Sequence, residues 1–198
     1  MVDPITSRRF LYRVVFLVVC MIAIFVKLLP LGTLPAAVTL IDPISGELVR
    51  EGGGGRIPGP DLLFCFTAAF IMRRPRWAPV LLIVGVHLLA DILFLRPVGL
   101  WAAISLIGYE VLRTRSAGST ELPIPFEVPL VAGTFAAITL GNALMLAIFA
   151  VPQAAFTTTL LQILTTALAY PFVIAVVHFM LRVRRVKPGE LEASGAIG

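Results

Sequence analysis

The sequence predicts an all-α membrane protein, a single domain of six transmembrane helices whose N- and C-termini both lie inside. Three observations support this prediction. The 198-residue chain is 59% hydrophobic and only 14% charged, with a mean hydropathy of +0.98, whereas soluble domains are roughly 25% charged. Its apolar residues fall into six runs that are separated by Pro, Gly and charged residues. Its arginines cluster at alternate ends of those runs.

The six runs predict the positions of the helices. A bilayer's hydrocarbon core needs about 20 helical residues for a perpendicular crossing, and the second run is short by this measure. It begins with Pro58, Gly59 and Pro60, which suit a helix start, and Asp61 lies near the expected N-cap. This helix is expected to thin the bilayer locally or to lean against its neighbours. We place the spans at about 11–31, 58–72, 78–95, 98–113, 126–151 and 155–181.

Two polar segments complete the domain. Residues 32–57 are expected to form a periplasmic loop, and residues 186–198 a disordered cytoplasmic tail. The glycines at 52–55 lack the following Lys and Ser/Thr of a phosphate-binding loop. A removable signal peptide is an alternative for the first run, because an arginine pair precedes it and residues 34–37 resemble a cleavage site. The run is long for a signal core, however, and the later spans need a first helix to orient them.

The positive charges predict the orientation. With the N-terminus inside, strict alternation puts twelve Lys and Arg residues in inner segments and three in outer loops, and Lys27 falls within the first span. Such an excess is typical of cytoplasmic segments. Omitting the short second span would move Arg73, Arg74 and Arg76 outside, so the pattern supports that helix. The other inner residues are Arg8, Arg9, Arg13, Arg113, Arg115, Arg182, Arg184, Arg185 and Lys187, and the outer ones are Arg50, Arg56 and Arg96.

Lys27 and Asp91 are the charges that are most costly to place in a membrane. Each lies about 13–16 residues from the inner end of its span, which puts both in the outer third of the bilayer. An unpaired charge there costs a few kcal/mol, so one hypothesis is that the two residues face each other or share a polar pocket. In the alternative, Lys27 extends to the outer interface and Asp91 bonds to backbone or turn groups.

Two further features accompany Asp91. His87 precedes it by four residues and so shares its helix face; it is either a proton-relay partner of Asp91 or a hydrogen-bonded core histidine. Pro97, Val98 and Gly99 form the outer turn between the third and fourth spans, and this turn makes the two spans a helical hairpin.

The fifth span carries a ladder of small residues, Gly133, Ala137 and Gly141, spaced four apart. Such spacing lets another helix approach closely, and in lipid this packing drives helix association. The neighbouring helix can belong to this chain or to a partner, and the sequence leaves that choice open.

No combination of residues predicts an enzyme. The chain has no HExxH or GxSxG motif and no Ser/Lys pair. Cys20 and Cys65 lie inside apolar runs without metal-ligand spacing, which is typical of small core residues. The basic residues form short clusters beside apolar runs, which argues against nucleic-acid binding. We therefore expect no catalytic residue, cofactor, metal or nucleic acid.

Residues 60–115 contain several short motifs whose order and spacing resemble those of a known protein family. They are Pro60-Asp61-Leu62-Leu63, the basic Pro turn at 73–76, Gly85, Leu88-Leu89-Ala90-Asp91-Ile92-Leu93, Pro97-Val98-Gly99-Leu100, Ala102 and Tyr109. In order and spacing the set resembles the MreD family of bacterial rod shape-determining membrane proteins. Leu89 departs from the family, which usually has a second small residue there. The other spans resemble the family in number, length and topology.

The resemblance implies a non-enzymatic scaffold of the bacterial inner membrane that binds MreC and couples it to lateral peptidoglycan synthesis. Partners implied in a larger complex are MreB, the RodA glycosyltransferase and its penicillin-binding transpeptidase. The family is also similar in fold to substrate-binding membrane subunits of energy-coupling-factor transporters, so the alternative function is binding of a small molecule. Only two Trp and three Tyr are present to stack on such a ligand. Candidate structural or partner-binding residues are Asp91, Lys27, His87, Asp61, Gly99, Gly133, Ala137 and Gly141.

Overall fold

The residues described by the computed structural model form six helices and one short hairpin, which confirms the predicted all-helical architecture. The structure describes residues 4–29, 39–41, 48–50, 58–73, 75, 78–118, 124–151 and 155–179, and the predicted tail at 186–198 lies outside these residues, as does most of the 32–57 loop. The helices are α1 (Pro4–Leu28), α2 (Leu62–Arg73), α3 (Val80–Leu93), α4 (Leu100–Gly118), α5 (Ile124–Ile148) and α6 (Phe156–Phe179). Strands β1 (Thr39–Ile41) and β2 (Leu48–Arg50) form an antiparallel pair, a feature that the sequence analysis did not predict.

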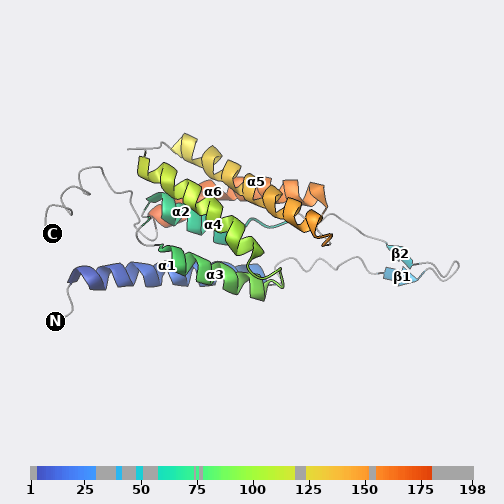
Figure 1. The fold of residues 1–198 in the computed structure, drawn as a ribbon, viewed down its shortest axis with the longest axis horizontal. Helices are drawn as coiled ribbons and strands as arrows, with labels where there is room; N and C mark the ends of the chain where they lie inside the picture. The colour runs from blue at the N-terminus through green and yellow to red at the C-terminus, as the bar shows by residue number, and fades with distance from the viewer. Residues whose placement is uncertain are drawn as a thin grey trace.

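Successive helices alternate in direction along the long axis of the molecule (Figure 1). As a result α1 begins, and α2, α4 and α6 end, at one end of the bundle, and the turn between α3 and α4 lies at the other end. Three stretches are long and apolar enough to cross a membrane: Phe10–Leu28, Pro125–Ile148 and Phe156–Phe179. These helices indicate a membrane protein, and α2 and α3 are apolar but shorter.

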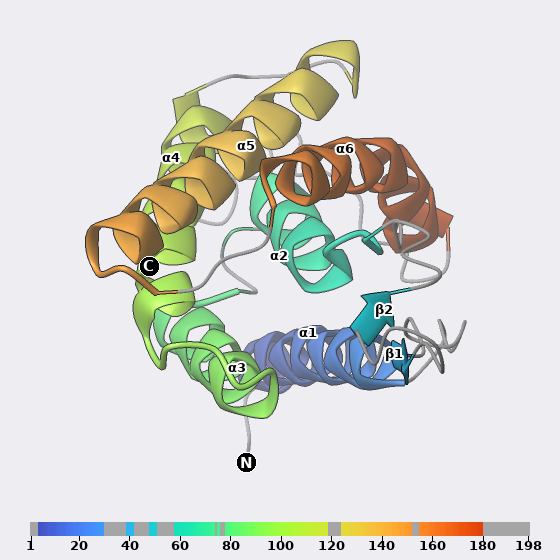
Figure 2. The ribbon, with the colours of Figure 1, turned by 90° about the vertical axis from the view of Figure 1, so that its right-hand side faces the viewer.

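The short helix α2 lies at the centre of the bundle (Figure 2). It packs against α1, α4 and α6, while α1, α3, α4, α5 and α6 contact one another in succession around it. Ten of its 12 residues are buried. At 1.5 Å per residue α2 extends about 18 Å, well short of a bilayer's hydrocarbon thickness. It therefore leans against its neighbours, as one of the two sequence-based alternatives expected.

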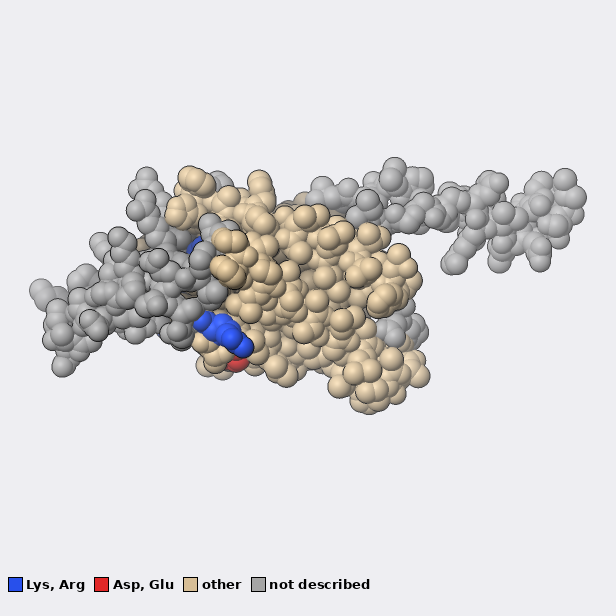
Figure 3. Space-filling view, turned by 90° about the horizontal axis from the view of Figure 1, so that it is seen from above, with Lys and Arg blue, Asp and Glu red and all other residues tan. Residues whose placement is uncertain are grey.

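The outer surface of the bundle is apolar. Large side chains such as Phe25, Leu81, Leu144, Leu168 and Phe172 are exposed along the helices, and charged atoms occupy a small part of the face seen in Figure 3, near the end where α1 begins. A soluble protein rarely exposes so extended an apolar surface. The exposed apolar surface thus agrees with the composition in indicating a membrane protein.

The close approach between α4 and α5 occurs at Gly108. A Cβ atom built there would lie 2.8 Å from Cγ1 of Ile138 and 3.1 Å from Cγ2 of Thr134. The predicted ladder on α5 is different, because Gly133 and Ala137 are exposed, and a Cβ at Gly133 would meet no atom within 4 Å. Gly141 is half-buried, with Ile104 Cγ2 3.9 Å from such a position. Most of the ladder therefore faces away from the described helices of this chain.

Candidate functional site

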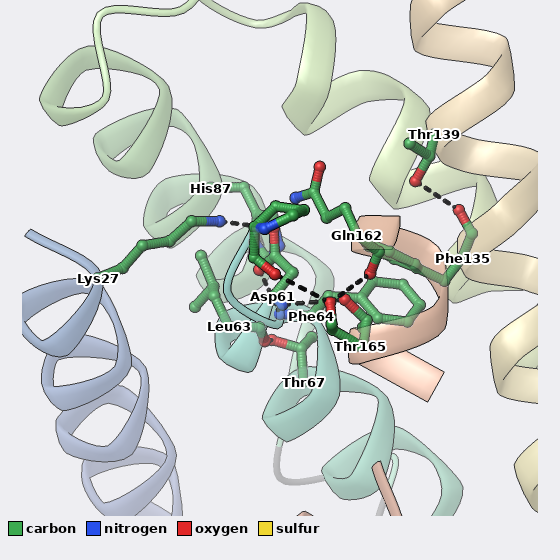
Figure 4. Close-up of polar contacts among 12 residues, drawn as sticks. Lys27, Asp61, Leu63, Phe64, Thr67, His87, Phe135, Thr139, Gln162 and Thr165 are labelled. Carbon is green, nitrogen blue, oxygen red and sulfur yellow. Dashed lines mark hydrogen bonds and ion pairs between the residues drawn. The ribbon is translucent and has the colours of Figure 1, made fainter. Parts of the chain in front are cut away.

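The site consists of buried polar groups at the two ends of α2. At the N-terminal end, Lys27 extends from α1 and its Nζ lies 2.8 Å from Oδ2 of Asp61 (Figure 4). The other carboxylate oxygen of Asp61 accepts a hydrogen bond from the backbone N–H of Phe64 at 3.2 Å. The backbone N–H of Asp61 donates to Oγ1 of Thr166 on α6 at 3.0 Å. Asp61 is thus the N-cap that the sequence predicts, and it also joins α1, α2 and α6.

Lys27 and Asp91 do not pair with each other, so the part of the hypothesis in which the two residues face each other is wrong. Lys27 bonds to Asp61, and Asp91 instead uses Oδ2 to accept hydrogen bonds from the backbone N–H groups of Gly99 at 3.0 Å and Ala102 at 3.2 Å. The first amides of a helix lack intrahelical acceptors, so a carboxylate near the end of α3 can satisfy those of α4. Gly99 suits this turn because its φ of 87° disfavours other residues. The alternative for Asp91, bonds to backbone and turn groups, is what the structure contains.

A substitution series at Asp91 tests this capping role. Asp91→Ala is expected to lower the free energy of unfolding by about 1 kcal/mol, the usual cost of losing an N-terminal cap. Asp91→Asn keeps an acceptor oxygen and should retain most of that stability. Denaturant titration in mild detergent measures both variants. A Lys27→Met/Asp91→Ala double variant whose loss differs clearly from the sum of the two single losses would contradict the separation of these residues.

His87 is a hydrogen-bonded core histidine and is not a relay partner of Asp91. Its Nδ1 lies 3.0 Å from the carbonyl oxygen of Ile83, and its Nε2 lies 2.9 Å from the hydroxyl of Tyr109. A carbonyl only accepts, so Nδ1 carries the proton, and in the neutral ring Tyr109 donates to Nε2. Both ring nitrogens are therefore occupied by groups other than Asp91. The bond to Tyr109 joins α3 to α4.

A second buried cluster lies at the C-terminal end of α2. Arg73 Nη1 is 2.9 Å from Oε1 of Glu127 on α5, and the Tyr170 hydroxyl of α6 donates to the same oxygen at 2.7 Å. The Arg73 and Glu127 side chains are 5% and 0% exposed. This cluster is absent from the sequence-based predictions. One signal was present: Glu127 shares a helical face with Val131, Phe135 and Ile138, which are all buried.

The charges at both ends of α2 agree with its dipole. A carboxylate near the N-terminus and a cation near the C-terminus are each stabilising, and Asp61 and Arg73 occupy these positions. Both charges are compensated by a partner from another helix, as buried charges require. The arrangement fixes a helix that is too short to span a bilayer on its own, and among the described residues it contains no nucleophile paired with a base. Among the described residues no group of three or more His, Cys, Asp or Glu could hold a metal ion.

The Lys27–Asp61 pair gives a second testable expectation. Lys27→Met leaves the Asp61 carboxylate buried without its cation, which should cost about 1–3 kcal/mol of unfolding free energy. Adding Asp61→Asn removes the uncompensated charge and keeps an acceptor for Phe64, so the double variant should be more stable than Lys27→Met alone. Denaturant titration of the three proteins measures the order. If the double variant is the least stable, the pair does not act as inferred.

No protein-family model, curated protein or solved structure matches the chain. Functional inference therefore depends on the geometry of the fold and on the residue pattern between 60 and 115.

Proposed function

We propose that this protein is a non-enzymatic scaffold of the bacterial inner membrane, of the MreD type. The observation that supports the proposal is a contrast between the buried polar groups, which join helices of this chain, and the small-residue face of α5, which is exposed. The buried ion pairs of the described residues connect one helix to another, at Lys27–Asp61 and Arg73–Glu127. The small-residue face of α5 at Gly133 and Ala137 is exposed and packs against no described helix of this chain. Such a protein uses its polar groups for architecture and its surface for assembly.

The proposed topology has six spans with both termini in the cytoplasm. Two features support it. The helices alternate in direction (Figure 1). Arg13, near the start of α1, and Arg73, Arg113 and Arg115, near the ends of α2 and α4, then share one end of the bundle. Basic residues favour the cytoplasmic side. In this topology α2 is too short to span the bilayer alone, and the longer helices packed against it cover the remaining thickness.

The proposed partner is MreC, a protein with a single span and a periplasmic domain. Through it, the scaffold acts with MreB, RodA and the penicillin-binding transpeptidase in lateral peptidoglycan synthesis. We assign the partner's membrane helix to the α5 face of Gly133, Ala137 and Gly141. Small residues allow the close backbone contact on which association in lipid depends.

Affinity purification in mild detergent, followed by mass spectrometry of proteins and small molecules, tests the proposal. The wild-type protein should retain MreC in near-equal amount. Gly133→Leu should reduce MreC recovery at least tenfold without loss of the folded protein, since no atom of the described residues lies within 4 Å of a Cβ there. Gly85→Leu is the matched control, because a Cβ on this exposed α3 glycine also meets nothing within 4 Å. Equal loss of MreC in both variants would contradict the assignment to α5.

The second candidate is a small-molecule-binding subunit of an energy-coupling-factor-type transporter. One observation favours it: the non-helical residues 58–61 lead into α2 beside the Lys27–Asp61 pair. Transporters form substrate sites where a helix is interrupted inside the membrane. In the same purification, a tightly held metabolite with an ATPase-associated partner, in place of MreC, would support this candidate and contradict the scaffold.

A further inference from the structure

Arg96 presents a guanidinium without a hydrogen-bond or ion-pair partner among the described residues, at the turn between α3 and α4. Its central carbon lies 5.5 Å from the ring centroid of Phe94 and 5.1 Å from that of Trp101. Cation–π contacts with the two rings hold the guanidinium in a fixed place beside them. Among the described side chains and carbonyls, none accepts a hydrogen bond from it within the usual distance. A guanidinium carries five donors in a planar fork, and here they remain available.

The surroundings of Arg96 are those of a membrane interface. Leu95 is 94% exposed and Val98 is 66% exposed on either side of it. The turn lies at the end of the bundle opposite the start of α1 (Figure 1). Apolar tips of this kind are stable when they lie among lipid chains. In a membrane, a guanidinium held between such apolar residues is expected near the lipid headgroups, where phosphate is the abundant anion.

The charged groups around Arg96 determine how much negative charge a ligand at this site can carry. Lys27 Nζ lies 5.2 Å from the centroid of the same Phe94 ring, so both cations contact this ring. Asp61, within electrostatic reach of Arg96, is already bonded to Lys27. Asp91 uses Oδ2 for two amides of α4, while its Oδ1 is buried without a hydrogen-bond partner. These two carboxylates would repel a strongly charged anion. A phosphodiester, with one negative charge, suits two cations that are partly offset in this way.

We propose that Arg96 and Lys27 bind the phosphodiester of a phospholipid headgroup at this end of the bundle. Arg96 supplies a forked pair of donors, which matches two phosphate oxygens. Lys27 keeps one donor on Asp61 and has two more, and its side chain is 25% exposed. The lipid tails then lie beside Leu95, Ile92 and Val98, which are all exposed. The site does not depend on the scaffold function proposed above.

The test measures the thermal unfolding midpoint of the full chain in an uncharged detergent with added ligands. The ligands are dioctanoyl phosphatidylglycerol, dioctanoylglycerol, which lacks the phosphate, and inorganic phosphate. Phosphatidylglycerol should raise the midpoint, and the other two should not. In Arg96→Gln the apparent affinity for phosphatidylglycerol should fall about tenfold, which corresponds to one lost charged contact. Arg13→Gln, an exposed cation at the opposite end of the bundle, should bind as the wild type does.

Several outcomes would overturn the proposal. An equal shift with dioctanoylglycerol would assign the effect to the tails, and an equal shift with inorganic phosphate would make the site one for free anions. Unchanged affinity in Arg96→Gln, or a matching loss in Arg13→Gln, would place the lipid elsewhere. If Arg96→Gln does not fold, Phe94→Leu removes the ring that both cations share and keeps both charges. This variant should also weaken phosphatidylglycerol binding, and unchanged binding would likewise overturn the proposal.

Discussion

Replacing Arg73 with methionine is expected to destabilise the protein by about 3–5 kcal/mol, the usual cost of breaking a buried ion pair. The substitution leaves the Glu127 carboxylate, which is 0% exposed, without the guanidinium that lies 2.9 Å away. Tyr170 still donates to that carboxylate, but a neutral hydroxyl does not replace the positive charge of the lost guanidinium. Denaturant titration in mild detergent, with helix content measured by circular dichroism, would follow the loss.

A double variant separates the charge effect from a packing effect. Adding Glu127→Gln to Arg73→Met removes the carboxylate charge that has lost its guanidinium and keeps an acceptor for Tyr170. Replacing both members of a buried pair is often close to neutral, whereas removing one is not. The double variant should therefore recover most of the lost stability. If it is as unstable as Arg73→Met, the volume of the arginine side chain matters more than the pair.

Gly108→Ala is expected to destabilise the protein by about 1–3 kcal/mol, the range for forcing extra atoms into a packed contact. The added Cβ would lie 2.8 Å from Cγ1 of Ile138, so either the Ile138 side chain must shift or α4 and α5 must separate. Away from such contacts, alanine is the better helix former by roughly 0.5–1 kcal/mol. The expected sign is thus the reverse of the intrinsic helix preference. The midpoint of denaturant-induced unfolding is the measurement.

Gly133→Ala is the matched control for Gly108→Ala. It makes the same chemical change in the neighbouring helix, where a Cβ meets no atom within 4 Å. The protein should keep or slightly gain stability. A loss at Gly133 equal to that at Gly108 would show that the two glycines are needed for a common reason, and the contact with Ile138 would not explain it.

The helices of this fold follow from local sequence. Apolar runs of helical length, prolines at their ends and alternating basic clusters are enough to predict six helices and the hairpin turn at Gly99. The cap at Asp61 was also predictable, because its signal is the Pro-Asp step before an apolar run. These features depend only on residues that are close together in the chain, so they can be predicted from a single sequence.

The pairing of buried charges was not predictable in the same way. Depth along a helix placed Lys27 beside Asp91, but Asp61 lies at a similar depth, and depth does not distinguish between two carboxylates on different helices. Arg73 appeared to be one of several topology-setting arginines, because its cluster continues into residues 74–76. Arg73 and Glu127 lie 54 positions apart, and their contact depends on where the fold places α5 relative to the end of α2. That information lies in the tertiary structure.

The position of α2 has a consequence for the synthesis of the chain. Its partners Glu127 and Thr166 follow Arg73 and Asp61 by 54 and 105 residues. When α2 leaves the ribosome, neither partner has been made, and its length of about 18 Å does not span the bilayer. It cannot complete its final contacts until α5 and α6 have entered the membrane. The central helix of the mature protein is therefore among the last to reach its place.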